Sequence, residues 1–582
     1  MKTSRTCLGA TKIAFEFRAS FAVFGFAIAA LTLMPFPLNG AQFYTNWAAA
    51  HFSGNPAQGD PLADPDSDGE ANVVEFAFGT DPLASGGIAG AVQPLSGGVS
   101  GTNAVFQVEI LEREGHQPGV QIDLYLSANL VNWFRPWWLR TTTNSLPSDP
   151  PGSVRELFTT RLPGTNVWFV RAKVQLVEGG AETAKYYVAT NGSDSNLGTN
   201  IAAPFATLGK AAGLATNGNL VYVRGGVYPT SAKISLSKIS VAGQPIRIRA
   251  YPGESPVLDF SGEASGTDGI SIRGNYYWLY GLTLTNAGHN SIVISGSNNI
   301  IERCVSLGAR NSGLHITGGS SAPLAYPSSN LFLNCDSIRN YDAATHGQNA
   351  DGFSAKWSLG PGNVFSGCRS WENADDGWDL WEGSQPVLIT NCWAFRQGTN
   401  IFGDTAWQGN GNGFKLGGAG TGAVHRVVCC LSFANMAYGI DQNNNSDGQI
   451  VDQNTVWNNN GGAINLNHLG SQYPVLQSSH IVRNNVAIGS VSIGSTATYP
   501  SIQMSNTWQA VFTNVNFSVN TNDFLSTDYT WAKAPRRDDG GLPENPFLRP
   551  VPTGRLVDKG ANIGGPFVGS APDLGAYETT RW

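Results

Sequence analysis

The side chains with the clearest chemical potential are four aspartates and one lysine, each within two residues of a glycine: Asp351, Asp375, Asp376, Asp379 and Lys415. Carboxylates that crowd together raise one another's pKa and destabilise a fold unless a cation pairs with them. Calcium takes about six to eight oxygen ligands from carboxylates, carbonyls and water. These residue types therefore predict a calcium site, provided that the fold brings them together. The alternative is a surface network of aspartate, lysine and water, because Asp-Gly is also common in turns.

A repeated phrase supplies the element that would position them. A polar residue, glycine, a large apolar residue and a second polar residue recur around Gly313, Gly352, Gly377, Gly413 and Gly439. The spacings of 39, 25, 36 and 26 residues are irregular. Irregular spacing is typical of a solenoid whose loops vary in length while its strands stay stacked. Equivalent positions on neighbouring strands would then lie about 4.8 Å apart.

Two columns of side chains follow from this stacking. The residues two positions after each glycine are His315, Ser354, Asp379, Lys415 and Asp441. Strand alternation places this column outside, opposite the apolar residue that precedes it. The residues just before each glycine are Ser312, Asp351, Asp376, Asn412 and Tyr438. We expect the glycine to bend the strand and to turn this second column outward as well.

Several phrases in this region resemble the family 9 polysaccharide lyases. They are residues 349–353 with Lys356, 360–365, 373–380 and 412–417. That family consists of right-handed parallel β-helix enzymes that cleave pectate by β-elimination with calcium. The resemblance implies that the four aspartates bind calcium and that Lys415 is the catalytic base. It is close over residues 345–420 and looser over residues 186–582.

The implied reaction removes the C5 proton next to the C6 carboxylate of homogalacturonan (polygalacturonate), and the leaving group departs from C4. Calcium would bind the uronate and stabilise the developing negative charge. Lys415 must be neutral to accept the proton, and an ordinary lysine has a pKa of about 10.4. We therefore expect an alkaline pH optimum. Lys356 and Arg396 are weaker candidates for contact with the substrate.

Three alternatives remain open from the sequence. The first is a lyase that acts on another uronate polymer such as rhamnogalacturonan. The second is a β-helix glycoside hydrolase, which needs two carboxyl groups about 6.5–9.5 Å apart for inverting hydrolysis and no metal. The third is a solenoid that binds carbohydrate without catalysis.

Composition supports an all-β protein that acts on something other than nucleic acid. Of 582 residues, 70 are glycine and only 13% are charged, and the net charge is −7. A negative chain is a poor partner for nucleic acid. We predict a right-handed parallel β-helix over residues 184–582, preceded by a calcium-loop segment over 42–86 and a small β-sandwich-like domain over 87–180. We expect the protein to be a monomer.

Residues 1–41 predict a secretory signal. Basic residues such as Lys2 and Arg5 precede an apolar run over 21–34, and the small residues Gly40 and Ala41 offer a cleavage point. The run is short for a membrane span, although an uncleaved anchor is the alternative. We expect a secreted protein with no membrane contact after cleavage.

Residues 64–75 match the pattern of a calcium-binding loop of twelve residues. The expected oxygen ligands are Asp64, Asp66, Asp68 and Glu75, with Gly69 at the turn. A structural calcium ion would bind here, and the alternative is a solvated acidic turn. Residues 88–176 alternate apolar and polar side chains, as β-strands do. Trp133, Trp137 and Trp138 lie in this part, where they would pack in a core or stack on sugar rings.

Smaller patterns support the stacked coils. Five cysteines recur once per coil, at 304, 335, 368, 392 and 430, and Asn454 and Asn485 continue the series. We expect these cysteines to be buried, unpaired thiols rather than disulfides. Asn373, Asn435 and Asn458 would form a second ladder of side-chain amides. Residues 206–215 would form a helix that caps the first coil, and residues 573–578 would pack along the solenoid.

Overall fold

The computed structural model describes residues 184–579 except 320–325, 474, 510–517, 538–539, 565–566 and 568. Before residue 184 it describes the strands β1 to β9 and scattered residues between 48 and 84. Among the described residues, no helix combines the length and the apolar character needed to cross a bilayer.

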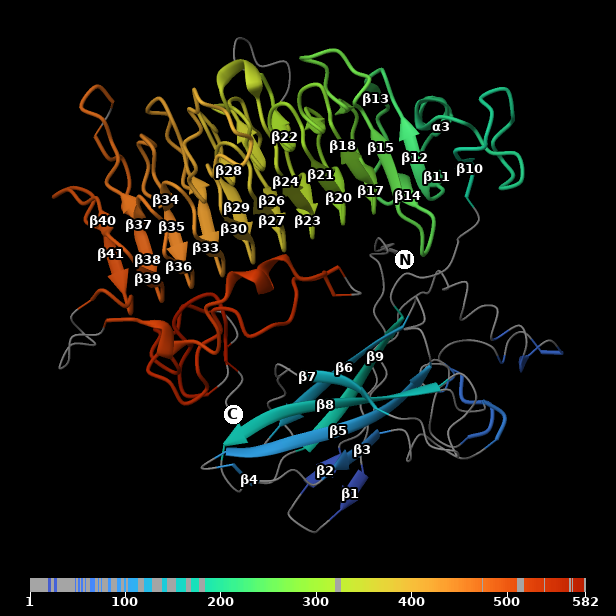
Figure 1. Ribbon diagram of the computed structural model, residues 1–582, viewed down its shortest axis with the longest axis horizontal. Coiled ribbons are helices and arrows are strands. Elements are labelled where there is room, and N and C mark those ends of the chain that lie inside the picture. Colours follow the sequence, from blue (N-terminus) through green and yellow to red (C-terminus); the bar gives the residue numbers. More distant parts are fainter. Residues whose placement is uncertain are drawn as a thin grey trace, which may run out of the picture.

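Residues 186–504 form a parallel β-helix, in which ten coils each contribute a strand to three long sheets, and one further strand extends the first sheet at each end (Figure 1). Sheet 1 contains β10 (Tyr186–Val188), β11 (Leu220–Val223), β14 (Ile246–Ala250), β17 (Tyr277–Tyr280), β20 (Ile300–Glu302), β23 (Leu331–Leu333), β26 (Asn363–Ser366), β29 (Val387–Thr390), β32 (Arg426–Val428), β35 (Ile450–Asp452), β38 (Ile481–Arg483) and β41 (Ile502–Met504).

Sheets 2 and 3 follow sheet 1 in each coil. Sheet 2 contains β12 (Gly226–Pro229), β15 (Pro256–Asp259), β18 (Thr283–Thr285), β21 (Val305–Leu307), β24 (Asp336–Ile338), β27 (Arg369–Trp371), β30 (Trp393–Phe395), β33 (Leu431–Phe433), β36 (Thr455–Trp457) and β39 (Val486–Ile488). Sheet 3 contains β13 (Ile234–Leu236), β16 (Ile270–Ile272), β19 (Ile292–Ile294), β22 (Leu314–Thr317), β25 (Phe353–Lys356), β28 (Trp378–Asp379), β31 (Phe414–Lys415), β34 (Tyr438–Asp441), β37 (Gly462–Leu466) and β40 (Val491–Ile493).

The repeated phrase forms the strands of sheet 3 in the predicted register. The outward column pairs in the order His315, Ser354, Asp379, Lys415 and Asp441. The large apolar residue before each of these faces the core, where side chains stack on the equivalent residue of the next coil. The rings of Phe353 and Trp378 are 4.7 Å apart, and those of Trp378 and Phe414 are 4.9 Å apart. This stacking fixes the register and hence the order of the outward column.

The glycine of the phrase breaks the strand alternation as predicted, but the physical reason is close packing. A Cβ on Gly352 would lie 1.9 Å from the hydroxyl oxygen of Ser370, and a Cβ on Gly413 would lie 2.1 Å from that of Ser432. Both serines belong to the next pass through sheet 2, so the glycines face the interior of the corner between sheets 2 and 3. The glycine and the apolar residue after it therefore both face inward, and the polar residue before the glycine is left outside.

Two buried polar ladders hold the corners together. The five predicted cysteines are buried free thiols, and Asn454 and Asn485 continue their column. The second ladder runs through Asn340, Asn373, Gln397, Asn435 and Asn459. The prediction of Asn458 was wrong by one residue. Asn458 has a φ of 50° at the turn, and Asn459 accepts the hydrogen bond from the N–H of Asn435.

The first coil is capped by a short helix, α3 (Leu208–Leu214), in place of the predicted 206–215. The Thr207 hydroxyl accepts a hydrogen bond from the N–H of Lys210 and so caps its N-terminus. Leu208, Ala211 and Ala212 face the core.

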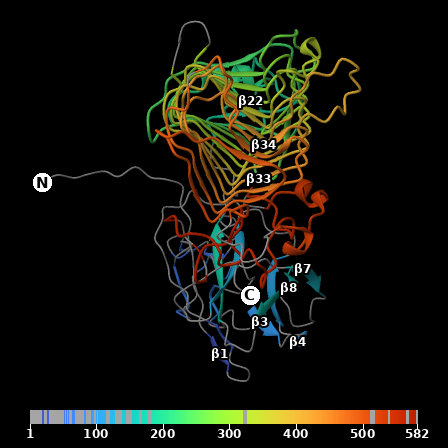
Figure 2. The same ribbon diagram turned by 90° about the vertical axis from the view of Figure 1, so that its left-hand side faces the viewer.

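The C-terminal segment folds back along sheet 2, as both views of the molecule show (Figures 1 and 2). It contains the 3₁₀ turns η5 (Thr521–Asp523) and η6 (Tyr529–Lys533). Arg536 and Arg369 both pair with Asp336 on β24, at 2.6 and 2.8 Å. Leu574 is buried in the apolar layer between segment and sheet. The predicted packing of residues 573–578 along the solenoid is therefore confirmed, and sheet 3 remains uncovered by this segment.

The residues before 184 contain two further sheets. One consists of β1 (Ala19–Phe21), β2 (Phe26–Ile28), β9 (Phe169–Leu176) and β6 (Val120–Ser127). The other consists of β3 (Val92–Leu95), β5 (Asn103–Arg113), β8 (Ser153–Pro163) and β7 (Leu139–Thr143), with β4 (Val99–Ser100) on β5. β1 and β2 lie within the predicted secretory signal. Its cleavage point at Gly40 and Ala41 lies outside the described residues, as do Trp133, Trp137 and Trp138.

Candidate active site

The candidate site lies on sheet 3 where three consecutive strands, β25, β28 and β31, run side by side. Asp379 and Lys415 are register partners in the outward column. Asp351 and Asp376 stand just before the glycines of their phrases, at the corner with sheet 2. Each of the three coils therefore contributes between one and three charged groups to the same patch, as the stacking predicted.

The carboxylates of Asp351, Asp376 and Asp379 meet within 4.8 Å of one another, and all three side chains are buried. Two lysines are inserted between them. Lys415 Nζ lies 3.0 Å from Asp376 Oδ2 and 3.4 Å from Asp379 Oδ2. Lys356 Nζ lies 2.9 Å from Asp351 Oδ2 and 2.7 Å from Asp379 Oδ2. Lys356 comes from β25, whereas Lys415 comes from β31, so the amines reach the acids from opposite sides.

The net charge of this cluster and its carboxylate oxygens suit a divalent cation. With Asp375 included, four carboxyl groups face two ammonium groups, so the fully ionised cluster has two negative charges in excess. Asp351 Oδ1 is buried and has no hydrogen-bond partner among the residues that the structure describes, and a buried acceptor without a partner is costly. Oxygen donors of this kind are the ligands that calcium prefers. The cluster is therefore chemically suited to hold Ca²⁺.

Burial and crowding shift the pKa values of the whole cluster. Burial raises the pKa of Asp351 to about 7. The positive charge of Lys356 lowers this pKa, whereas the negative charges of Asp379 and Asp376 raise it. Burial also raises the pKa of Asp379, but Lys356 and Lys415 outweigh it, so that the pKa of this carboxyl is lowered. For Lys415, burial favours the neutral amine, and Asp376 and Asp379 outweigh burial and raise its pKa well above the ordinary value. Lys415 is thus a charged amine held in place by two acids.

Comparison with known proteins places this site in a family. A family model described as the Pel9A-like, right-handed β-helix region matches residues 186–485, which is more than half of the chain. The chain belongs to this Pel9A-like family.

Relatives of known structure and name agree with the assignment. Pectate lyase L of Dickeya dadantii (strain 3937) is 37% identical over 428 residues, which cover 71% of this chain and 95% of the relative. The crystal structure of pectate lyase Pel9A is 34% identical, with a TM-score of 0.60, and the match covers 68% of this chain and 96% of that one. A rhamnogalacturonan lyase structure is 27% identical, with a TM-score of 0.54, over 63% and 96% of the chains. The right-handed β-helix and the resemblance to the family 9 polysaccharide lyases are confirmed.

In this Pel9A-like chain, Asp375 flanks the cluster instead of joining its innermost group. It is buried, and its Oδ1 accepts a hydrogen bond of 2.7 Å from the N–H of Asn410. Asn412 lies two residues further on and donates to Asp376 Oδ1 through both its backbone N–H, at 2.7 Å, and its side-chain amide, at 3.0 Å. The loop between β30 and β31 therefore holds both aspartates in position.

The structure does not bring Arg396 to the cluster, so its assignment to the substrate site is corrected. The Arg396 guanidinium lies 3.0 Å from Glu372 Oε1, and Lys533 of the C-terminal segment pairs with the same oxygen. Arg396 also lies over the ring of Tyr529. The residue follows β30 at the turn, where Glu372 comes from the turn after β27 and Tyr529 comes from the segment that covers sheet 2. Arg396 therefore helps to attach the C-terminal segment to sheet 2.

Sequence reasoning missed one aromatic side chain at the site. Trp381 follows Asp379 by two residues, and Lys415 Nζ lies 5.4 Å from the centre of its ring. The backbone N–H of Trp381 donates to Asp379 Oδ1 at 3.0 Å. Trp381 stands outside the repeated phrase, so the column argument could not include it. Its position two residues after an acid of the phrase was the available signal.

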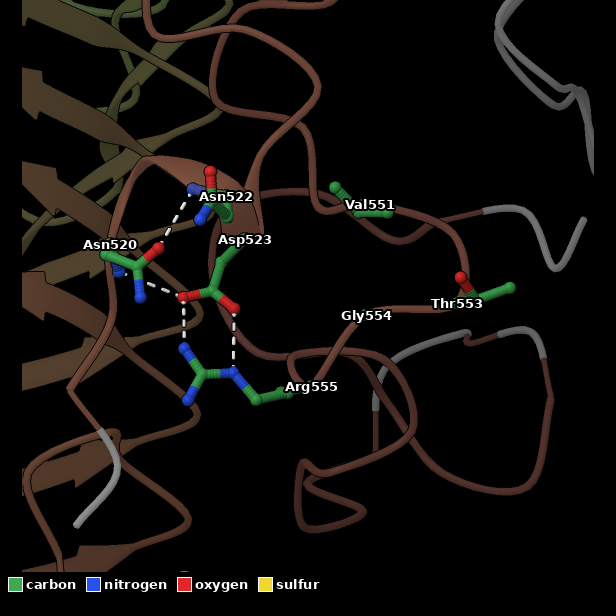
Figure 3. A pocket seen from close by; sticks show the side chains of 7 residues that line it. All are labelled: Asn520, Asn522, Asp523, Val551, Thr553, Gly554 and Arg555. Carbon is green, nitrogen blue, oxygen red and sulfur yellow. Dashed lines mark hydrogen bonds and ion pairs between the residues drawn. The ribbon is translucent and has the colours of Figure 1, made fainter.

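The predicted loop at residues 64–75 is described in part. Asp64 and Asp66 are half-buried and Glu75 is buried, whereas Asp68 lies outside the described residues. A separate hollow occurs in the C-terminal segment, where Asp523 pairs with Arg555 at 2.7 Å (Figure 3). The Asp523 carboxylate also accepts the N–H of Asn520. The Asp523 carboxylate in this hollow is thus already paired, and the hollow is distinct from the cluster on sheet 3.

Proposed function

We propose that this protein is a secreted, monomeric, calcium-dependent pectate lyase that cleaves polygalacturonate by β-elimination. The observation that carries the proposal is Lys415, an amine buried against Asp376 and Asp379 in a cluster with two uncompensated negative charges. The pectate lyases among its relatives support the same reaction. A hydrolase of the inverting kind needs two separated carboxyl groups and no such amine.

Asp351, Asp376 and Asp379 would hold the calcium ion, with Asp375 beside them as a fourth acid. A bound calcium ion would supply positive charge for the substrate carboxylate and for the charge that develops when the proton leaves. Lys356, whose ammonium lies between Asp351 and Asp379, would contact the same carboxylate.

Lys415 would act as the general base. Its neutral amine takes the C5 proton, and the C5–H electron pair forms the C4–C5 double bond as the C4–O4 bond breaks. O4 leaves with the neighbouring sugar and takes a proton from water. Because Asp376 and Asp379 favour the charged lysine, the fraction of neutral amine rises with pH. This is the physical basis for an alkaline optimum.

The remaining assignments concern the other parts of the chain. We propose a removable secretory signal over 1–41, a calcium-loop segment over 42–86, a β-sandwich-like domain over 87–180 and the lyase domain over 184–582. Asp64, Asp66, Asp68 and Glu75 would bind a second, structural calcium ion. Burial of Glu75 at the last position of the loop supports this assignment.

A second candidate function is elimination on rhamnogalacturonan. It is favoured by the structural match to a rhamnogalacturonan lyase, which covers nearly the whole of that protein. The same base and metal would serve both substrates, because both reactions start at a uronate C5.

The deciding experiment measures the ultraviolet absorbance of unsaturated uronate ends. Polygalacturonate and rhamnogalacturonan are tested separately, with added calcium and with a chelator. We expect a calcium-dependent rise with polygalacturonate. A rise with rhamnogalacturonan alone would select the second function, and no rise with either polymer would refute both.

A further inference from the structure

The outward column of sheet 3 carries one more acid directly beyond Lys415. Asp441 on β34 is the register partner of Lys415 on β31. Its side chain lies on the same face of the sheet, because Phe414 and Ile440 before them both point into the core. Asp441 is 2% exposed. A buried carboxylate thus stands one coil away from the proposed base.

His468 neutralises this acid. Its Nδ1 lies 3.1 Å from both oxygens of Asp441, and its side chain is 44% exposed. The backbone carbonyl of His468 accepts a hydrogen bond from Asn444, which fixes the loop after β37 against the loop after β34. Because Nδ1 is directed at the acid, Nε2 is the ring nitrogen directed away from it. The hydrogen bond to Asp441 raises the pKa of His468.

An acid at this position has a consequence for a polyanionic substrate. Asp441 alone would repel a uronate bound beside the base. The imidazolium of His468 removes that repulsion and offers a second N–H, from Nε2, to an anion. Among the described residues that pack on His468, Asp441 is the titratable group that faces the ring.

We propose that His468, oriented by Asp441, binds the carboxylate of the uronate adjacent to the one that Lys415 deprotonates. The inference rests on the proposed function and extends it by one substrate-binding position. His468 takes no part in the proton transfer, so its contribution is to substrate binding.

The pH dependence follows from the geometry. As the pH rises, the imidazolium loses the Nε2 proton, because the Nδ1 proton is held by Asp441. The donor to the substrate is then lost and the charge of Asp441 is no longer balanced. KM for polygalacturonate should therefore increase with pH through the titration of His468, while kcat follows Lys415.

The test compares His468→Ala and His468→Lys with His289→Ala. His289 is a matched control because its Nδ1 lies 2.8 Å from Asp268 and its side chain is 41% exposed. It precedes β19, which is four strands away from β31 in sheet 3. We expect His468→Ala to raise KM about tenfold, the size of one charge-assisted hydrogen bond, with kcat little changed. His468→Lys should restore the low KM and remove its pH dependence. His289→Ala should leave both constants unchanged.

A second readout separates this inference from the proposed function. Binding of a short oligogalacturonate is measured by calorimetry for the same three variants, whether or not the wild type is active. Weaker binding in His468→Ala, restored in His468→Lys, supports the inference even without eliminase activity. An unchanged affinity and KM, an equal loss in His289→Ala, or a loss of kcat alone would overturn it.

Discussion

Replacing Lys415 by alanine tests the assignment of the base, and replacing Lys356 by alanine supplies the matched control. The two lysines are about equally buried, with side chains 10% and 12% exposed. Each pairs with two aspartates, and both share Asp379. Either change removes one positive charge from the same cluster. The variants therefore differ in chemistry and position but hardly in electrostatic cost.

The structure sets the size of both effects. Removing one partner of a buried ion pair costs about 3–5 kcal/mol in the free energy of unfolding, because a buried charge loses its compensation. We expect that loss in both variants when calcium is removed, and partial recovery with calcium, which binds the folded state. The rates should differ. Loss of a general base lowers kcat by about 10²–10⁴-fold, whereas loss of Lys356 should chiefly raise KM.

The assay combines two measurements on each variant. Denaturant unfolding with and without a chelator gives the stability, and the rise in unsaturated product gives kcat and KM at saturating calcium. A Lys415→Ala enzyme that retains a wild-type kcat would refute the assignment of the base. Equal losses of kcat in the two variants would attribute the effect to cluster charge instead of proton transfer.

Three further predictions concern the metal, the acid stability and the packing. Asp376→Asn should weaken calcium binding measured by calorimetry, because it removes a charge and keeps the shape. Burial lowers the pKa of His425 to about 3 and of His480 to about 4. The unfolded chain, with histidine pKa values near 6.5, therefore binds more protons below that pH, and stability should fall as the pH drops from about 6.5 to 4. His480→Gln should make urea unfolding less sensitive to this change. Gly413→Ala should lower the free energy of unfolding by about 1–3 kcal/mol or more, because its Cβ would meet Ser432.

Much of the site could be predicted because the solenoid repeats its geometry. Once the glycine phrases were aligned, their neighbours on adjacent strands followed, and the register of Asp379 with Lys415 is the predicted one. The same alignment placed Asp351 and Asp376 beside them. A stacked fold converts spacing along the sequence into distance in space, which few other folds do.

What escaped prediction depends on parts of the chain that do not repeat. Arg396 stands one coil from Glu372, and the same acid also pairs with Lys533, more than a hundred residues further along. The C-terminal segment that brings Lys533 there has no repeated phrase. Which of the two neighbours Asn458 and Asn459 joins the second amide ladder depends on the geometry of the turn, and the sequence pattern does not determine that geometry. Local spacing predicts neighbours within the solenoid but does not predict what covers it.

The two lysines explain how such an acid cluster can be built before any metal binds. Buried carboxylates without counter-charges would oppose folding. Lys356 and Lys415 supply two of the four charges from within the chain and leave a deficit that one divalent ion can fill. If they supplied all four charges, calcium would have no electrostatic reason to bind, and if they supplied none, the apoprotein would be unstable. The base is therefore also a counter-ion. The same amine of Lys415 accepts the proton and stabilises the acid cluster. The two roles are therefore separated by comparing the Lys415 and Lys356 variants.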